Sequence, residues 1–290
     1  MRKKINLFSR VSLLVLFSLV FSINAGAQTR EVKDDIIKIL AIGNSFSEDA
    51  VEQYLYDLAH EEGIPVVIGN MYIGGCSLQK HMKNAQENRP AYRYRKIGPD
   101  GKMTEMKGTS LEKALRDENW DYVSFQQQSG KSGIYSTWEE DLPQLIDYVR
   151  TMVSKKTEFV IHQTWAYAED SNHRDFKNYS NDQITMYNAI VDAVKRSAKL
   201  TKVKVVVPCG TAVQNARTTV LKDMTTRDGY HLDLKVGRYI AACTWFEKIF
   251  GVDVTGKEFA PEGVTPEQRI LAQKAAHAAV KKPYKITKIK

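Results

Sequence analysis

The sequence predicts an α/β fold, in which helices cover both faces of a central parallel sheet of about five strands. Strand-like and helix-like segments alternate along the chain after its N-terminal segment. No internal repeat, low-complexity tract or linker interrupts them. Residues 28–290 are long enough to bury one sizeable core, so we expect a single domain there.

Residues 1–27 have the pattern of a signal peptide. Basic residues precede an apolar run at 11–23, and Ala25-Gly26-Ala27 offers a cleavage site before Gln28. The alternative is an uncleaved N-terminal anchor. Because no other apolar segment is long enough to cross a bilayer, we expect export to the periplasm or the outside of the cell, without stable membrane insertion after cleavage.

The elements follow from apolar runs and from their boundary residues. Apolar runs predict strands, and the first of them ends at Gly43. Acidic residues after Ser47 indicate the first turn of a helix, and Ser77 is a candidate cap for another. The predicted strands are 36–42, 65–72, 122–126, 159–163 and 202–208. The predicted helices are 49–62, 77–84, 110–117, 139–154, 181–200, 234–250 and 266–281.

One segment departs from the alternation. Residues 92–96 and 103–107 flank the turn Gly98-Pro99-Asp100-Gly101, which is typical of a small hairpin inserted between sheet elements. Its alternating aromatic and basic residues could line a cleft, but such a stripe is more often a solvated insertion, which we favour.

Composition excludes several functions. The net charge falls from +8 to about +4 when the four positive charges of residues 1–27 are removed. This charge is too small to indicate nucleic-acid binding, and the sequence has no nucleic-acid-binding motif. No metal or nucleotide cofactor motif is present. Four histidines show no metal-ligand spacing, namely His60, His81, His173 and His277. Cys76, Cys209 and Cys243 are expected to be small buried residues, with Cys209–Cys243 as the one pair to test for a disulfide.

Ser45 is the candidate nucleophile. It follows the first strand in Ile42-Gly43-Asn44-Ser45, at a strand-to-helix turn on the edge where α/β sheets bind ligands. Its hydroxyl can face a cleft, and its own N–H can help to stabilise a developing negative charge. Gly-Asn-Ser alone is a weak signal, because many turns use these residues.

Two further loops could complete an oxyanion site. Gly75 lies in the turn after the second strand, where glycine lets an N–H approach a ligand, although ordinary turns also favour glycine. Gln126 ends the third strand, and its amide could donate to an oxyanion. Gln127 and Gln128 remain alternatives for this role.

The candidate base is His231, in Asp228-Gly229-Tyr230-His231. A histidine takes the proton of a serine nucleophile, and an acidic partner orients its ring. The spacing lets Asp228 converge with His231 from one loop, and Asp233 is an alternative partner. A serine with a distant aspartate and histidine is the combination of a catalytic triad for acyl transfer.

The ordered set of Ser45, Gly75, Gln126 and Asp228-x-x-His231 resembles the SGNH/GDSL hydrolase superfamily over nearly the whole of residues 28–290. Asn70-x-x-x-x-Gly75 also looks like the second block of that family. The resemblance implies a flavodoxin-like three-layer α/β/α sandwich. It implies Ser45 as nucleophile, His231 as base and Asp228 as its partner, with the N–H groups of Ser45 and Gly75 in the oxyanion hole.

The chain departs from that family at two blocks. The usual Gly-Asp-Ser-Leu reads Gly43-Asn44-Ser45-Phe46, and the Gln126–Gly130 run replaces the usual Gly-x-Asn-Asp. Some carbohydrate esterases of the superfamily use Gln at that place. With the segment 162–167, the pattern looks like a subfamily of secreted bacterial proteins, a resemblance that identifies no substrate.

Several other residues are candidates for substrate contact. His162 and Trp165 lie at the end of the fourth strand, and Trp165 and Tyr167 could stack on a sugar ring or pack in the core. Arg217 could bind an acidic substrate group or pair with an acidic side chain. Asn44 and Gln128 complete the candidates.

These observations predict a secreted serine esterase without cofactor or metal, acting on a small-molecule or glycan ester such as an O-acetylated carbohydrate. A lysophospholipase or acyltransferase on the same scaffold is one alternative. A non-catalytic glycan-binding protein is another. The sequence leaves the oligomeric state open.

Overall fold

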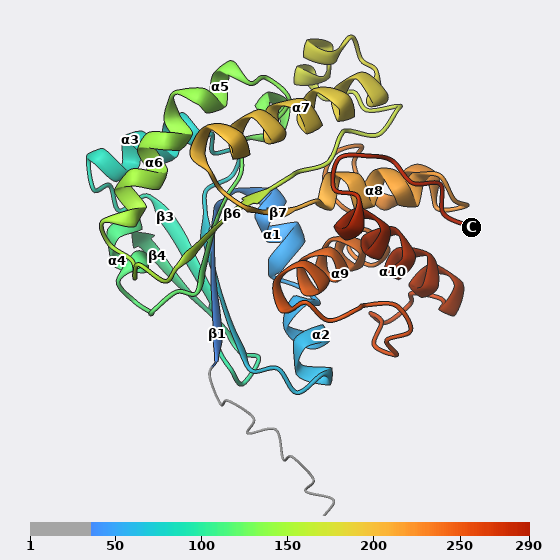
Figure 1. The fold of residues 1–290 in the computed structure, drawn as a ribbon, viewed down its shortest axis with the longest axis horizontal. Coiled ribbons are helices and arrows are strands. Elements are labelled where there is room, and N and C mark those ends of the chain that lie inside the picture. Colours follow the sequence, from blue (N-terminus) through green and yellow to red (C-terminus); the bar gives the residue numbers. More distant parts are fainter. Residues whose placement is uncertain (1–35) are drawn as a thin grey trace, which may run out of the picture. The chain divides into compact units, whose positions relative to one another are not determined.

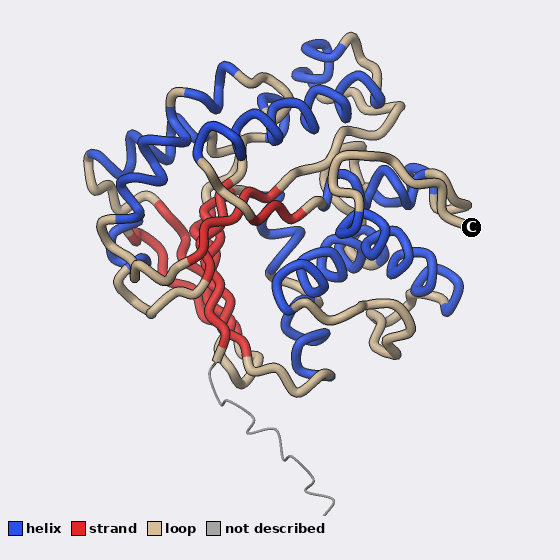
Figure 2. The backbone as a smooth tube through the Cα atoms, in the orientation of Figure 1, coloured by secondary structure: helices blue, strands red, loops and turns tan. Residues whose placement is uncertain are grey.

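The computed structural model describes residues 36–290, which form one compact unit. A seven-stranded sheet runs through them in the order β4-β3-β2-β1-β5-β6-β7 (Figures 1 and 2). Its parallel strands are β2 (Val66–Tyr72), β1 (Ile37–Gly43), β5 (Tyr122–Phe125), β6 (Glu158–His162) and β7 (Val205–Val207). The predicted signal peptide lies outside the described residues.

Helices cover both faces of the sheet, which confirms the predicted α/β/α sandwich (Figure 1). One layer contains α3 (Leu78–Gln86), α4 (Leu111–Leu115), α5 (Ser136–Glu139), α6 (Asp141–Arg150) and α7 (Gln183–Thr201). The other contains α1 (Ser45–Val51), α2 (Leu55–Glu61), α8 (Cys209–Arg217), α9 (Val236–Phe250) and α10 (Pro266–Lys281).

The expected hairpin is present, but it extends the sheet instead of standing in solvent. β3 (Tyr92–Ile97) pairs antiparallel with β2, and β4 (Met103–Thr109) pairs antiparallel with β3. Tyr92, Tyr94 and Ile97 are buried, so the strand contributes to the core. The estimate of about five strands therefore counts the parallel ones correctly and misses these two.

The strand order places a crevice beside β1. The chain runs from β1 to its neighbour β2, and later returns to β5 on the other side of β1. In an open α/β sheet, ligands bind outside the carboxyl ends of the strands at such a reversal. The turns after β1, β2 and β5 carry Ser45, Gly75 and Gln126, so the topology brings the predicted blocks to one edge.

Three helical segments differ from prediction. The first helix begins at Ser45 itself and not at residue 49, and Tyr54 in the left-handed region (φ 69°) separates α1 from α2. The predicted helix 139–154 is two helices, α5 and α6. Helix α8 was not predicted, because its sequence Cys209–Arg217 is mostly polar or small. No helix among residues 36–290 combines the length and apolar character of a membrane span.

The structure contains no disulfide between Cys209 and Cys243, the pair that we identified for testing. Cys209 and Cys243 are both free and fully buried, as is Cys76. The Cys209 Sγ lies 3.8 Å from the carbonyl oxygen of Ala241, to which it donates. All three therefore fill the core as small apolar side chains.

Candidate active site

The turn after β1 places Ser45 at the first position of a helix. Asn44 is extended (φ −148°), and its side-chain oxygen accepts from the N–H of Phe46 at 3.0 Å, so it caps α1. A Cβ on Gly43 would lie 2.3 Å from the Oγ of Ser47. Only glycine fits this close approach, and the tight turn leaves the Ser45 side chain at the crevice.

A loop far along the chain meets Ser45. His231 Nε2 lies 2.9 Å from Ser45 Oγ, and His231 Nδ1 lies 2.7 Å from Asp228 Oδ2. The other Asp228 oxygen accepts from the N–H groups of Tyr230 (3.2 Å) and His231 (2.7 Å). This pattern suits an imidazole with its proton on Nδ1, which leaves Nε2 free to accept the serine proton.

The loop favours an ionised Asp228. Partial burial alone would raise the pKa of Asp228, but hydrogen bonds from the His231 ring and from two loop N–H groups lower it below its ordinary value. Asp233 has another role, because its Oδ1 accepts from the N–H groups of Lys235 and Val236 at the start of α9. Of the two predicted partners, Asp228 is therefore the one in contact with His231.

Ser45 and His231 open onto a cleft of about 540 Å³. Gly75 lies on the same cleft, exposed and in the left-handed region (φ 60°), with no atom within 4 Å of the place of a Cβ. Its backbone conformation, and not crowding, is what favours glycine there. The lining residues are Ser45, Tyr72, Gly74, Gly75, Ser77, Gln128, Ser129, Lys131, His173, Arg174, Asp175, Tyr230 and His231.

Gln126 does not lie on this cleft. It is 1% exposed, its amide nitrogen donates to Asn44 Oδ1 at 2.9 Å, and its amide oxygen lies 2.7 Å from His162 Nδ1. The strand ends one residue earlier than predicted, at Phe125, and the Gln126 side chain turns beneath the nucleophile turn. The geometry therefore does not support our prediction that Gln126 is an oxyanion donor.

The next two glutamines differ from each other. The Gln127 side chain is buried and joins α3 to α5, since it accepts from the N–H of Leu78 (3.0 Å) and donates to the carbonyl of Thr137 (2.7 Å). Gln128 lines the cleft. Its amide oxygen accepts from the N–H of Lys131 (3.1 Å), and its amide nitrogen points to Asp175 (3.4 Å).

Three predicted substrate contacts are buried instead. Trp165 is fully buried and stacks on Phe46 with ring centroids 4.3 Å apart, and Tyr167 is fully buried with its hydroxyl 2.8 Å from Ser129 Oγ. His162 is 1% exposed, and burial lowers its pKa to about 3. None of the three can reach a sugar in this structure, so the core-packing alternative is correct for them.

Arg217 and Asn44 are also internal. The Arg217 side chain is 4% exposed, and its Nε lies 2.7 Å from Asp223 Oδ1, so it pairs with an acidic side chain as the alternative supposed. Burial lowers its pKa to about 10. The Asn44 amide donates to the carbonyl of Cys76 at 3.0 Å, which ties the first block to the second.

Sequence reasoning missed several cleft residues. Tyr72 ends β2, Tyr230 lies inside the Asp228–His231 loop, and Lys131 follows Gln128. His173 also lines the cleft, although the sequence shows no ligand spacing for it. The positions of Tyr72 and Tyr230, each beside a block that we identified, are the signal that could have pointed to them.

The family of the chain follows from direct comparison. Residues 38–279 match the model of the family described as Domain of unknown function (DUF4886). A crystal structure of a DUF4886 family protein from Bacteroides uniformis is 54% identical to this chain, covers 88% of it and 98% of its own length, and superposes with a TM-score of 0.87. This chain belongs to the DUF4886 family. No curated protein sequence matches it.

More distant solved structures share the fold of this DUF4886 protein. A candidate SGNH hydrolase from Slackia heliotrinireducens is 18% identical over 74% of this chain and all of its own (TM-score 0.50). Axe2, an acetylxylan esterase from Geobacillus stearothermophilus, is 14% identical over 78% of this chain and 97% of its own (TM-score 0.50). At such identities the likeness shows the fold alone.

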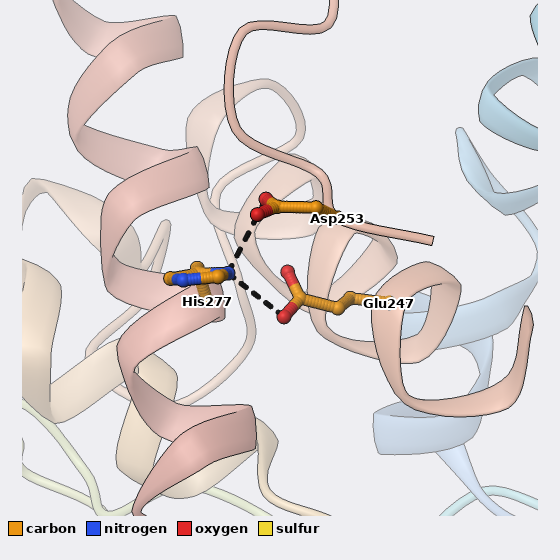
Figure 3. A group of neighbouring side chains, drawn as sticks. All are labelled: Glu247, Asp253 and His277. Atoms are coloured by element: carbon orange, nitrogen blue, oxygen red, sulfur yellow. Dashed lines mark hydrogen bonds and ion pairs between the residues drawn. The ribbon is translucent and has the colours of Figure 1, made fainter. Parts of the chain in front are cut away.

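A second polar cluster of the DUF4886 protein is formed by α9, the loop after it and α10 (Figure 3). His277 Nδ1 lies 2.9 Å from Glu247 Oε1 and 3.3 Å from Asp253 Oδ1. The imidazole nitrogen contacts both carboxylates, and Asp253 Oδ1 also accepts from the N–H of Thr255 at 2.8 Å. The sequence did not indicate this group, which joins α9, the loop after it and α10.

Proposed function

We propose that this protein is an SGNH-type serine esterase that hydrolyses ester bonds through an acyl-enzyme on Ser45. The observation that carries the proposal is the continuous chain from Ser45 Oγ to His231 (2.9 Å) to Asp228 (2.7 Å). A serine hydroxyl becomes an effective nucleophile only when a base removes its proton. His231 and Asp228 supply the base and its orienting partner.

The reaction divides into two steps. His231 accepts the Ser45 proton while Oγ attacks the ester carbonyl, and the leaving alcohol takes that proton as the ester C–O bond breaks. Water then attacks the acyl-enzyme, and His231 accepts its proton and returns it to Ser45 as the acid departs. The N–H groups of Ser45 and Gly75 are the proposed donors to the oxyanion.

The cleft supports a carbohydrate ester as substrate. Tyr72 and Tyr230 are its aromatic side chains, and its other side chains are polar or charged. No aliphatic side chain lines it in the described part of the chain, which disfavours the long acyl chain of a lysophospholipid. Axe2, which shares the fold, is named an acetylxylan esterase, so an acetylated glycan is the class that we propose.

We also propose that the protein is exported. Residues 1–27 have the composition of a signal peptide, and an exported esterase would meet extracellular or periplasmic glycans. N-terminal sequencing of the protein recovered from cell fractions measures this. The proposal expects a mature chain that begins at Gln28.

The proposal is tested with Ser45→Ala. Loss of the triad in a serine hydrolase costs on the order of a millionfold in turnover, so the variant should have no measurable activity while it keeps the wild-type circular dichroism spectrum. The substrates to compare are acetylated sugars, short-chain aryl esters and long-chain lysophospholipids. Full activity of purified Ser45→Ala protein would exclude the mechanism.

A fluorophosphonate probe separates the remaining alternatives. It should label wild-type protein at Ser45 and leave Ser45→Ala unlabelled, whereas a non-catalytic glycan-binding protein would not react. Faster turnover of lysophospholipids than of acetylated sugars would favour the lipid alternative. Acyl transfer to an added alcohol in preference to water would favour the transferase.

A further inference from the structure

A fully buried carboxylate lies one helical turn after the nucleophile. Asp49 is on α1, which begins at Ser45, and its exposed fraction is 0%. A carboxylate in the interior is costly unless charged partners and hydrogen-bond donors surround it. Asp49 does not line the cleft, so its partners identify its role.

Those partners come from the loop and the helix that hold the base. Asp49 accepts from the backbone N–H of Leu232 at 2.8 Å, from Arg227 Nη1 at 3.0 Å and from Arg238 Nε at 2.9 Å. Leu232 directly follows His231, and Arg227 directly precedes Asp228. Asp49 therefore contacts both flanks of the Asp228–His231 loop.

The loop is also attached to the segment after β6, where the N–H of Ala168 donates to the carbonyl of Gly229 at 2.7 Å and Trp165 Nε1 donates to the carbonyl of Tyr230 at 2.8 Å. A single bridge joins Thr226 to Leu232, and the N–H of Arg227 donates to the carbonyl of His231 at 3.0 Å. These contacts shape the loop and hold it to the segment after β6, but they do not attach it to α1. The bonds to Asp49 do, across a separation of 178 to 189 residues.

From this geometry we propose that Asp49 is a positioning residue, which holds His231 within hydrogen-bond reach of Ser45 by binding Arg227, Leu232 and Arg238. The proposal rests on the esterase mechanism proposed above. Its physical basis is alignment, because a misplacement of about 1 Å between reacting groups can lower a rate about a hundredfold. Asp49 touches no reacting atom, so substrate binding should not depend on it.

The test compares Asp49→Asn with wild-type protein. Asparagine keeps the size of the side chain but loses its charge, and it must offer an amide where three donors converge. We expect kcat and the second-order rate of fluorophosphonate labelling to fall about tenfold to a hundredfold per folded molecule, with KM within about twofold. Labelling reports the reactivity of Ser45 without any dependence on sugar binding.

Glu247→Gln is the matched control. Glu247 is also buried and also pairs across helices, but its partner His277 belongs to the cluster on α10 and not to the cleft. This variant should lose thermal stability and keep wild-type kcat and labelling. A purely structural role for Asp49 predicts that the two variants behave alike, with activity falling only in proportion to the unfolded fraction, and that result would overturn the proposal.

A second variant covers the case in which Asp49→Asn does not fold. The Arg227 side chain is 31% exposed, so Arg227→Gln should be tolerated better, and it removes the side-chain bond from the loop to Asp49 while the bond from the Leu232 N–H remains. The same fall in kcat and labelling at constant KM is expected. Wild-type rates in Arg227→Gln would overturn the proposal. Wild-type protein without any reaction would overturn the esterase mechanism itself, an outcome distinct from an active enzyme that is indifferent to these substitutions.

Discussion

The Tyr72 side chain lies between the cleft and the Arg95 guanidinium on β3. It ends β2, lines the cleft and is partly exposed. The guanidinium carbon of Arg95 lies 4.3 Å from the centroid of its ring, which fixes the ring orientation from one side. Such a preorganised aromatic side chain is suited to stack on a sugar.

We therefore expect Tyr72→Ala to raise KM for an acetylated disaccharide about threefold to tenfold, with kcat for a small aryl acetate nearly unchanged. Tyr167→Phe is the control, because Tyr167 is fully buried and loses only its contact with Ser129. Steady-state kinetics on both substrates measures the effect. An unchanged disaccharide KM in Tyr72→Ala would remove Tyr72 from the proposed binding site.

Single residues also show what the sequence can reveal about the site. Ser45, Asp228 and His231 were found because their chemistry is specific and because each lies in a loop beside a predictable element. The roles of Gln126 and Trp165 were not predictable. A polar or aromatic residue after a strand can turn to the cleft or to the core, and only the packing of the neighbouring loops decides.

At the scale of elements, a buried ion pair attaches the β3–β4 hairpin to α1. Arg95 on β3 lies 2.8 Å from Glu52 Oε2, and the two side chains are 8% and 6% exposed. Burial raises the pKa of Glu52, although hydrogen bonds from Asn70 and Arg95 oppose the shift. Its charged form is therefore favoured by Asn70 and Arg95 together.

Arg95→Ala should destabilise the protein by about 3–5 kcal/mol, because it leaves Glu52 buried without a counter-charge. Arg93→Ala on the same strand should cost much less, since the Arg93 side chain is 46% exposed in its pair with Glu105 and solvent screens that pair. Urea unfolding of both variants compares them. Equal losses would mean that the hairpin is not held by this pair.

The elements also show where pattern reasoning stops. The alternation Tyr92-Arg93-Tyr94-Arg95 indicated a strand, but nothing local showed whether its apolar face was covered. Helix α8 is stabilised by its surroundings: a Cβ on Gly210 would lie 2.1 Å from the carbonyl oxygen of Thr164. Such tertiary packing overrides weak helix propensity, and a sequence pattern does not report it.

At the scale of the whole molecule, two buried histidines link stability to pH. Burial lowers the pKa of both His81 and His162 to about 3. In the unfolded chain a histidine takes up its proton near about pH 6.5. The unfolded state therefore binds more protons between these values, and stability falls as pH decreases from about 6.5 towards 3.

We expect each of these histidines to remove about 2 kcal/mol of the free energy of unfolding between pH 7 and pH 5. His162→Gln retains a donor for Gln126 and loses the titration, so its stability should depend less steeply on pH than that of the wild type. Urea unfolding at the two pH values gives both slopes. Parallel slopes would show that His162 takes up its proton as readily in the folded state as in the unfolded chain.

The burial of Cys76, Cys209 and Cys243 makes the reactivity of their thiols differ between the folded and the unfolded chain. Burial raises the pKa of Cys76 to about 12, and it also raises the pKa of the other two thiols. Thiolate is the form that reacts with oxidants and attacks disulfides, so the buried thiols of the folded protein are unreactive at these positions. A chain that emerges unfolded into an oxidising compartment has an odd number of reactive thiols, and each wrong disulfide would block the core that those side chains fill. On the export route that we propose, rapid folding is what protects these thiols from wrong disulfides.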